Sequence, residues 1–502
     1  MEQLINYFES KVTKRMKYSF LIAFLTGLLI HLYIITNGFV NHDTMYNYYS
    51  NQNMSSSGRF TLTYLAGISS YFDLHLLNGL LSILYLALTV SLMVELLNIK
   101  SKLAILLTAI LYISFPTIAG IFMYMFTADG YNLGTLLAVM SIYCVMKVHK
   151  SYVAVIIASL LLYVSIASYQ ANLAIVLTLV LIIFVKDNFE QNVSLSFYVK
   201  NIISIILGLG LYVFHFKLYD RYSENGLTSY KGINESGNIN LDHIIQSLEM
   251  ARDEMTSFLF NSGEYINTFE KFNIVYFVLL FIMLLLSIFV CKLHWKNIIG
   301  LIISTVLAPY ITHILFFISP GVEYHILMRQ NLVLLFIVGV VIIDLLYKHK
   351  SVHTIGFTIL FTFSVSLVAF NNVIITNIYY EKFEDVNKQT SSLLTQVAYD
   401  IRHLDGYNEN LNIIIFGTPS IHLSVGNRYE KVPPNVGTTT RVIYDTNTFV
   451  YYLNNEIGLK NGIKFEMQNF IDKHIEEINT LTIWPDQSSM KIIEDTVVIK
   501  FE

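Results

Sequence analysis

The chain carries little charge. Of its 502 residues, 14% are charged and 54% are hydrophobic, and the mean hydropathy is +0.54. A soluble domain has roughly a quarter charged residues, so this composition excludes a soluble multidomain enzyme. Lys and Arg total 32 and Asp and Glu total 36, which leaves a net charge of −4 and no basic field for a nucleic-acid partner.

The chain is also poor in cysteine and in the short motifs of several enzyme classes. Its two cysteines, Cys144 and Cys291, lie in or beside apolar runs, which excludes a disulfide framework or a cysteine zinc site. The sequence has no Walker A pattern, no Gly-x-Ser-x-Gly elbow and no His-Glu-x-x-His helix. It has no Asp-x-Asp pair, which disfavours a metal-held nucleotide sugar. The sequence therefore predicts no cofactor and no metal-binding motif, although it does not exclude a requirement for a divalent metal.

Long apolar runs are what the chain has in abundance. A membrane helix needs roughly 20 apolar residues, and about eleven runs approach this length. We therefore predict an α-helical polytopic membrane protein. The runs lie near residues 18–37, 74–98, 103–125, 131–147, 151–168, 171–186, 201–216, 272–291, 297–318, 330–347 and 353–377.

The orientation follows from Lys and Arg, because short cytoplasmic loops retain positive charge. Basic residues precede the first run and occupy alternate connections. This pattern predicts a multi-pass protein of the cell membrane with its amino terminus in the cytoplasm. These residues are Lys11, Lys14, Arg15, Lys17, Lys100, Lys102, Lys147, Lys150, Lys186, Lys200, Lys292, Lys296, Lys348 and Lys350. Two long segments, residues 217–271 and the tail from about 378, then fall on the outer face.

The tail has the pattern of a small α/β domain. Residues 381–403 and 465–481 have helical spacing of apolar residues, whereas 411–416 and 497–501 are typical of strands. We therefore expect a membrane domain over residues 1–377, including the long outer loop 217–271, and an extracytoplasmic α/β domain over residues 378–502.

Ionisable residues are nearly absent from the middle of the runs, where they would mark an ion pathway. Glu95 and Asp344 fall near predicted cytoplasmic ends, where water is within reach. This distribution argues against an ion-coupled transporter, which needs a carboxylate near the midplane. The polar residues concentrate instead at the outer rim.

The first outer loop is the richest polar cluster. Asp43 follows a membrane helix beside apolar residues, and such a carboxylate can act as a general base toward a hydroxyl. The alternative is that Asp43 caps a short helix. Arg59 offers a planar fork of donors to a phosphate oxygen, or it extends to lipid headgroups. His42 completes the cluster.

Other rim residues extend the candidate site, each with a plain alternative. Asp129 is a second outer carboxylate or part of an Asp-Gly turn. Tyr169 and Gln170 can bind sugar hydroxyls, or they satisfy helix ends. Arg329 is a second phosphate candidate or an arginine that reaches the headgroups. The remaining candidates are Glu323, beside Arg329, and the basic residues Arg221 and Lys231 of the long loop.

Together these motifs resemble the bacterial type II glucosyltransferase family, integral membrane enzymes of the GT-C class. The likeness rests on Asp43, Gly58-Arg59, Ser114-Phe115-Pro116, Tyr124 to Asp129, Ser168-Tyr169-Gln170, and Trp484-Pro485 followed by a terminal strand pair over 490–501. That family often has two adjacent acidic residues after the first span. Here His42 stands before Asp43, so Asp43 is the only match for the catalytic position.

The resemblance implies a GT-C-like fold and transfer of one hexose, typically glucose. The donor would be a polyprenyl-phosphate sugar in the membrane lipid, and the acceptor a cell-envelope glycan or teichoic-type polymer on the outer face. A donor synthase and a small flippase would be partners. Asp43 would be the inverting base. Arg59, Arg329, Arg221 and Lys231 would bind the donor phosphate, and Asp129, Tyr169, Gln170, His42 and Glu323 the sugar or acceptor.

Two other classes of protein remain. One is a lipid-linked saccharide flippase or transporter, which should have polar residues on both leaflets, whereas those of this chain lie on one side. The other is a non-catalytic membrane scaffold that presents the tail domain. A scaffold would tolerate a neutral replacement of Asp43.

Overall fold

The computed structural model describes most of the chain. The described residues are 12–47, 54–69, 73–223, 226–228, 240–260, 270–319, 322–349, 352–421, 441–464 and 467–502. The chain divides into two compact units. We call the first the membrane unit, formed by Met1–Asn37, Asn51–Asn377 and Lys431–Asn435. We call the second the C-terminal unit, formed by Gly38–Ser50, Ile378–Glu430 and Val436–Glu502.

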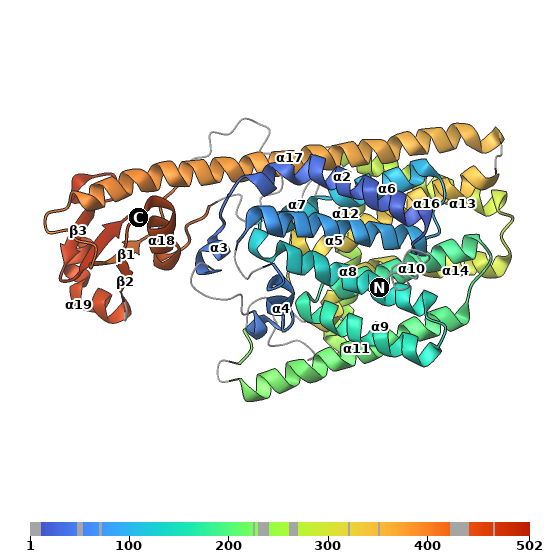
Figure 1. Ribbon diagram of the computed structural model, residues 1–502, viewed down its shortest axis with the longest axis horizontal. Helices are drawn as coiled ribbons and strands as arrows, with labels where there is room; N and C mark the ends of the chain where they lie inside the picture. Colours follow the sequence, from blue (N-terminus) through green and yellow to red (C-terminus); the bar gives the residue numbers. More distant parts are fainter. Residues whose placement is uncertain are drawn as a thin grey trace, which may run out of the picture. The chain divides into compact units, whose positions relative to one another are not determined.

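The membrane unit is a bundle of long helices, drawn side by side in Figure 1. Within the described residues, nine helices are long and apolar enough to cross a membrane, or ten if one bent pair counts as a span. The nine are α2 (Lys14–Thr36), α5 (His75–Leu96), α9 (Ser151–Ser168), α10 (Asn172–Phe189), α11 (Leu195–Tyr222), α13 (Glu270–Val290), α14 (Trp295–Thr312), η4 with α16 (Ile326–Leu332, Val333–His349) and α17 (Val352–Arg402).

The bent pair, α6 (Lys102–Ser114) and α7 (Pro116–Phe122), corresponds to the expected run 103–125. The two helices meet at an angle of 46°. The bend lies at Phe115, whose ψ of 131° is extended. Proline has no N–H and disfavours helical geometry in the residue before it. Pro116 therefore ends α6 and starts α7.

One of the eleven expected runs, 131–147, lies in a helix that is not apolar enough to count as a membrane span. This helix is α8 (Met125–Lys147). Its first half carries buried polar residues, among them Thr127, Asp129 and Asn132. α8 packs against α5 and α9, and most of its residues are buried. A helix covered by other helices has no need of an apolar surface for lipid.

The predicted outer loop contains a further helix, α12 (Leu241–Phe260). Ser247, Ala251, Met255 and Phe258 are buried at intervals of three and four residues, which places them on one face. The preceding helix, α11, also runs six residues past the predicted end of its span. The described part of the segment 217–271 is therefore largely helical. The short elements of this unit are η1 (Ser55–Ser57), α4 (Leu62–Ala66) and α15 (Leu315–Ile318).

The C-terminal unit has a four-stranded sheet in the order β2-β1-β4-β3. The central strand β1 (Asn412–Phe416) is parallel to β2 (Gly462–Ile463) and β4 (Thr496–Lys500), and β3 (Met490–Ile493) is antiparallel to β4. Ile413 and Ile415 join one core and Ile414 the other, because alternate side chains of a strand face opposite sides. The helices α18 (Thr446–Tyr452) and α19 (Met467–Asn479) complete the unit.

One short segment from early in the chain belongs to the C-terminal unit. α3 (His42–Asn47) packs against α18, and Met45 of this helix and Val40 just before it are buried in the larger core of that unit. The backbone N–H of Val40 also donates to Asn387 Oδ1 at 3.0 Å. The candidate base Asp43 is therefore held by the C-terminal unit.

The expected span 353–377 and the expected amphipathic helix 381–403 form one helix. α17 runs unbroken over 51 residues (Figure 1). Beyond Gly356 it contains no glycine and no proline, so nothing in the local sequence ends the helix before Arg402.

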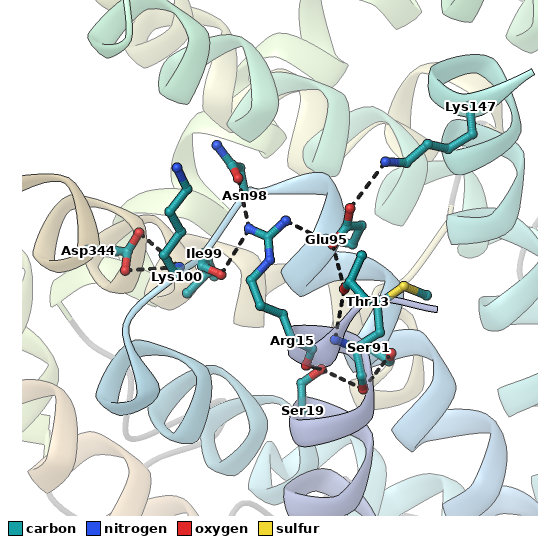
Figure 2. Close-up of polar contacts among 11 residues, drawn as sticks. Thr13, Arg15, Ser19, Ser91, Glu95, Asn98, Ile99, Lys100, Lys147 and Asp344 are labelled. Atoms are coloured by element: carbon teal, nitrogen blue, oxygen red, sulfur yellow. Dashed lines mark hydrogen bonds and ion pairs between the residues drawn. The ribbon is translucent and has the colours of Figure 1, made fainter. Parts of the chain in front are cut away.

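Glu95 and Asp344 stabilise helix ends (Figure 2). Arg15 and Lys147 point toward Glu95 and pair with its two oxygens at 3.0 and 3.1 Å. Asp344 accepts the backbone N–H groups of Lys100 and Ser101, just before α6. Both carboxylates thus have structural partners at the ends predicted to be cytoplasmic.

Candidate functional site

Arg59 contacts two aromatic side chains in the membrane unit. Its guanidinium donates to the hydroxyl of Tyr131 at 2.8 Å. It also lies 5.2 Å from the ring centre of Tyr169 and 5.8 Å from that of Tyr131, within the range of a cation–π contact. The two rings contact each other with centroids 4.8 Å apart. The predicted residues Arg59 and Tyr169 are therefore brought together. Tyr131 of α8 and Tyr169, directly after α9, hold the guanidinium in place.

Gln170 supports the turn that presents Arg59. Its amide donates to the backbone carbonyl of Ser57 at 2.8 Å and to the hydroxyl of Tyr212 at 3.0 Å. Gly58 has φ of +72°, and a Cβ there would lie 2.6 Å from the Tyr212 hydroxyl. Only glycine fits this left-handed, crowded position. Gln170, predicted to bind sugar, thus has a role in positioning Arg59.

Asp129 is buried in α8, two residues before Tyr131, and is 1% exposed. The alternative that Asp129-Gly130 forms a turn is wrong, because both residues lie inside the helix. Gly130 lets α4 approach closely: a Cβ there would lie 2.9 Å from Leu62 Cδ1. This packing leaves a buried carboxylate on the same helix as Tyr131.

Arg329, the second candidate for binding the donor phosphate, lies on η4 of the membrane unit. The residue is 8% exposed and pairs with Glu254 of α12 at 3.2 Å. The alternative that Arg329 extends to lipid headgroups does not fit this burial. A buried guanidinium with a carboxylate partner is instead held in one orientation.

Asp43 lies on α3 in the C-terminal unit. The alternative role for Asp43 was the cap of this helix, but Asn41 Oδ1 accepts the N–H groups of Asp43 and Thr44 at 2.8 and 3.0 Å. Asn41 thus serves as the cap. The Asp43 side chain stays 40% exposed, and the contact it makes with His42 Nε2 is 3.4 Å long. Its carboxylate is accessible to solvent.

The neighbours of Asp43 attach α3 to the C-terminal unit. His42 lies against the ring of Tyr444 with centroids 4.6 Å apart, and burial lowers the pKa of its imidazole below 6.5. Tyr46 donates to Asp445 at 2.9 Å, and burial together with this carboxylate raises the pKa of Tyr46 to about 12. Both side chains are therefore neutral at pH 7, and the charge of Asp43 is not neutralised by His42.

The remaining predicted residues lie apart from these contacts. Arg221 is at the end of α11, with its guanidinium 5.6 Å from the ring centre of Tyr222. Glu323 is exposed in the segment before η4. Lys231 lies outside the described residues.

Three residues of these sites were not found from the sequence: Tyr131, Glu254 and Asp445. Tyr131 and Asp445 carried a weak signal, since each is a polar residue near a helix start. Glu254 had none, because it is one of several charged residues on an amphipathic helix and lies 75 positions before Arg329.

Comparison with known proteins bears on the membrane unit. Neither the curated proteins nor the solved structures compared with the chain contain a match. The family model described as Glucosyl transferase GtrII matches residues 32–330, more than half of the chain. The match includes the site residues predicted from the sequence, from His42 to Arg329, and confirms the resemblance to this family over residues 32–330, whereas the motif Trp484-Pro485 and the strands over 490–501 lie outside it. The chain therefore belongs to the GtrII glucosyl transferase family, a family of transferases.

Proposed function

We propose that this protein transfers a single hexose, typically glucose, from a polyprenyl-phosphate donor to a cell-envelope glycan on the outer face of the membrane. Membership of a glucosyl transferase family supports the sugar transfer. The lipid-linked donor, the acceptor and the inverting mechanism are the proposal. The positions of basic residues in the short connections support the outward orientation.

An apolar groove in the membrane unit carries the proposal of a lipid-linked donor. It has a volume of about 450 Å³ and is lined by side chains of α10, α12, α13, α14 and α16, nearly all of them apolar. A ligand with a long hydrocarbon chain fits such a lining, whereas a nucleotide sugar does not.

The groove lies close to a cation suited to phosphate. Met255 and Leu259 of α12 line it, and Glu254, the next residue of the same helix, pairs with Arg329. Leu335, six residues after Arg329, also lines the groove. A polyprenyl chain in the groove would therefore have its phosphate within reach of the Arg329 guanidinium.

The proposed chemistry is a single displacement. Asp43 accepts the proton of an acceptor hydroxyl, whose oxygen forms a bond to the anomeric carbon of the donor sugar. The bond from that carbon to the phosphate oxygen breaks, and the electron pair leaves with the polyprenyl phosphate. Arg329 or Arg59 stabilises the departing phosphate. The configuration at the anomeric carbon inverts.

The test compares Asp43→Asn with the gene deletion. Envelope polymers are analysed for sugar composition and mass in cells with the intact gene, the deletion or the variant, at equal membrane levels of protein. We expect one hexose to disappear in both mutants. Asp405→Asn, at an exposed carboxylate of the same unit, is the matched control and should retain the hexose. Full restoration by Asp43→Asn would show that Asp43 is not the base.

A further inference from the structure

The C-terminal unit contains a cavity that the proposed chemistry does not use. Its volume is about 430 Å³, within the range of small-ligand sites. It is lined by Gln389, Ser392, Leu393 and Gln396 of α17, by Pro419, Ser420 and Ile421 after β1, and by Trp484, Pro485 and Phe501. All of these residues belong to one unit.

Three polar side chains from α17 line one wall. Gln389, Ser392 and Gln396 are three and four residues apart, which places them on one face of the helix. None of the three has a hydrogen-bond partner among the described residues, and Ser392 and Gln396 are exposed. Two amides and a hydroxyl are therefore free to donate to and accept from a ligand.

Trp484 also lines the cavity, and two contacts hold its side chain in place. Its indole N–H donates to Asp400 at 3.0 Å, and its ring meets Phe501 edge to face with centroids 6.0 Å apart. The side chain is half-buried. A large aromatic surface thus contributes to the lining together with the free amides.

The charge of the lining narrows the class of ligand. The ten lining residues that the structure describes include no acid and no base, so none of these ten would compensate the charge of a phosphate or a charged peptide. An aromatic ring beside amide and hydroxyl groups fits a neutral ligand that has many hydroxyls and an apolar face. This is the chemistry of a sugar ring.

We propose that this cavity binds a sugar unit of the acceptor glycan and holds that polymer on the C-terminal unit. The inference rests on the proposed function, since a glycan acceptor is what gives the enzyme a reason to bind a saccharide away from the donor. Trp484, Gln389 and Gln396 are then binding residues for the acceptor and take no part in the bond changes.

The chain offers a direct readout, because it has two tryptophans, Trp295 and Trp484. The probe is a mixture of short oligosaccharides released from the envelope of gene-deleted cells, which lacks the transferred hexose. In full-length Trp295→Phe protein, Trp484 is the only tryptophan, and we expect its emission to change and saturate with added probe. In full-length Trp484→Phe protein, the emission of Trp295 should stay constant.

Substitutions in the α17 wall test the contacts. Gln389→Ala with Gln396→Ala should raise the dissociation constant of the probe at least tenfold and raise KM for the acceptor, with KM for the donor unchanged. Thr395→Ala, at an exposed residue of the same helix outside the cavity, is the control and should bind normally. Ser392→Phe, which fills the cavity, should abolish binding, and its melting temperature shows that the protein is folded.

The outcomes separate this inference from the proposed function. If the wild type transfers hexose while Trp484 does not respond and the α17 variants keep their acceptor KM, the cavity does not bind the acceptor. If the probe binds and the variants lose it while no protein transfers hexose, the saccharide site stands and the proposed function fails.

Discussion

At the scale of single residues, the clearest result is the division of labour in residues 41–43. Asn41 caps α3, His42 is half-buried against Tyr444, and Asp43 is left with an accessible carboxylate. Burial holds His42 neutral, because transfer of an imidazolium from water into the fold costs free energy. The acid is therefore accompanied by a neutral imidazole at physiological pH.

This burial makes the stability of the protein depend on pH. The pKa of His42 is lowered mainly by burial and also by Arg441, against the effects of Asp43 and Asp445. As the pH falls below 6.5, the unfolded chain binds a proton at this position before the folded chain does, so stability decreases until the lowered pKa is reached. We expect His42→Gln to lose less thermal stability than the wild type between pH 7.5 and 5.5.

The measurement is thermal unfolding of both proteins across this pH range in the same detergent. Each unit by which folding lowers the pKa of His42 corresponds to about 1.4 kcal/mol of the free energy of unfolding. The other histidines contribute equally to both proteins, so the difference between the two slopes reports His42. Equal slopes would mean that His42 is not buried as described.

At the scale of helices and strands, the functional contacts come from elements that are distant in sequence. η4 supplies Arg329 and α12 supplies Glu254, and α12 and α16, the helix that follows η4, also line the apolar groove. A structural ion pair and a phosphate site make opposite predictions here. In a structural pair, removal of either partner leaves a buried charge and is costly. In a phosphate site, the arginine matters more than its partner.

We therefore expect different results from the two halves of this pair. Arg329→Gln should lower kcat/KM for the donor by about 100-fold, as for loss of one group that stabilises a developing anion. Glu254→Gln should leave this value within a few-fold of the wild type, because the guanidinium remains and loses a competing anion. Purified protein and a polyprenyl-phosphate sugar suffice for the measurement. Equal losses in both variants, with recovery in the double variant, would assign a structural role to the pair.

The sequence predicted elements better than contacts. Long apolar runs located most of the membrane helices, a short apolar run located β1, and alternation located β4, because these patterns are local in the sequence. The run 131–147 was given as a span, yet α8 is sheltered by α5 and α9 and can carry Asp129. The continuity of α17 was missed because helical spacing on either side of residue 378 does not reveal a break or its absence.

For the candidate site too, the sequence indicated single residues but not their contacts. Asp43, Arg59 and Arg329 stood out as isolated charged residues beside apolar runs. The attachment of α3 to a unit whose other segments lie more than 300 residues later in the chain could not be predicted. It depends on the tertiary packing of Val40 and Met45. The role of Gln170 as a support for the Gly58 turn likewise depends on contacts that no local pattern encodes.

At the scale of the whole molecule, the orientation in the membrane decides whether the proposed reaction is feasible. A glycan acceptor outside the cell requires Asp43 and the C-terminal unit to be on the outer face. The basic residues of the connections predict this orientation. Asn192, between α10 and α11, should then face the cytoplasm, and Gln487, in the C-terminal unit, should face outward.

Labelling of single cysteines tests this orientation. In a chain with Cys144→Ser and Cys291→Ser, we expect Gln487→Cys to react with a membrane-impermeant maleimide in intact cells. Asn192→Cys should react only after the membrane is permeabilised. Both positions are exposed in the fold, so access of the reagent depends on the side of the membrane. The reverse pattern would place the C-terminal unit in the cytoplasm and contradict the proposed acceptor.

The membership of α3 in the C-terminal unit also has a consequence for biosynthesis. Residues 38–50 leave the ribosome early, but the core that buries Val40 and Met45 includes Val442, Phe449 and Val497, which are made last. At about 5–20 residues per second, these partners follow roughly 20 to 80 seconds later. During translation the segment with Asp43 therefore has no completed core to hold it until the last residues of the C-terminal unit are made.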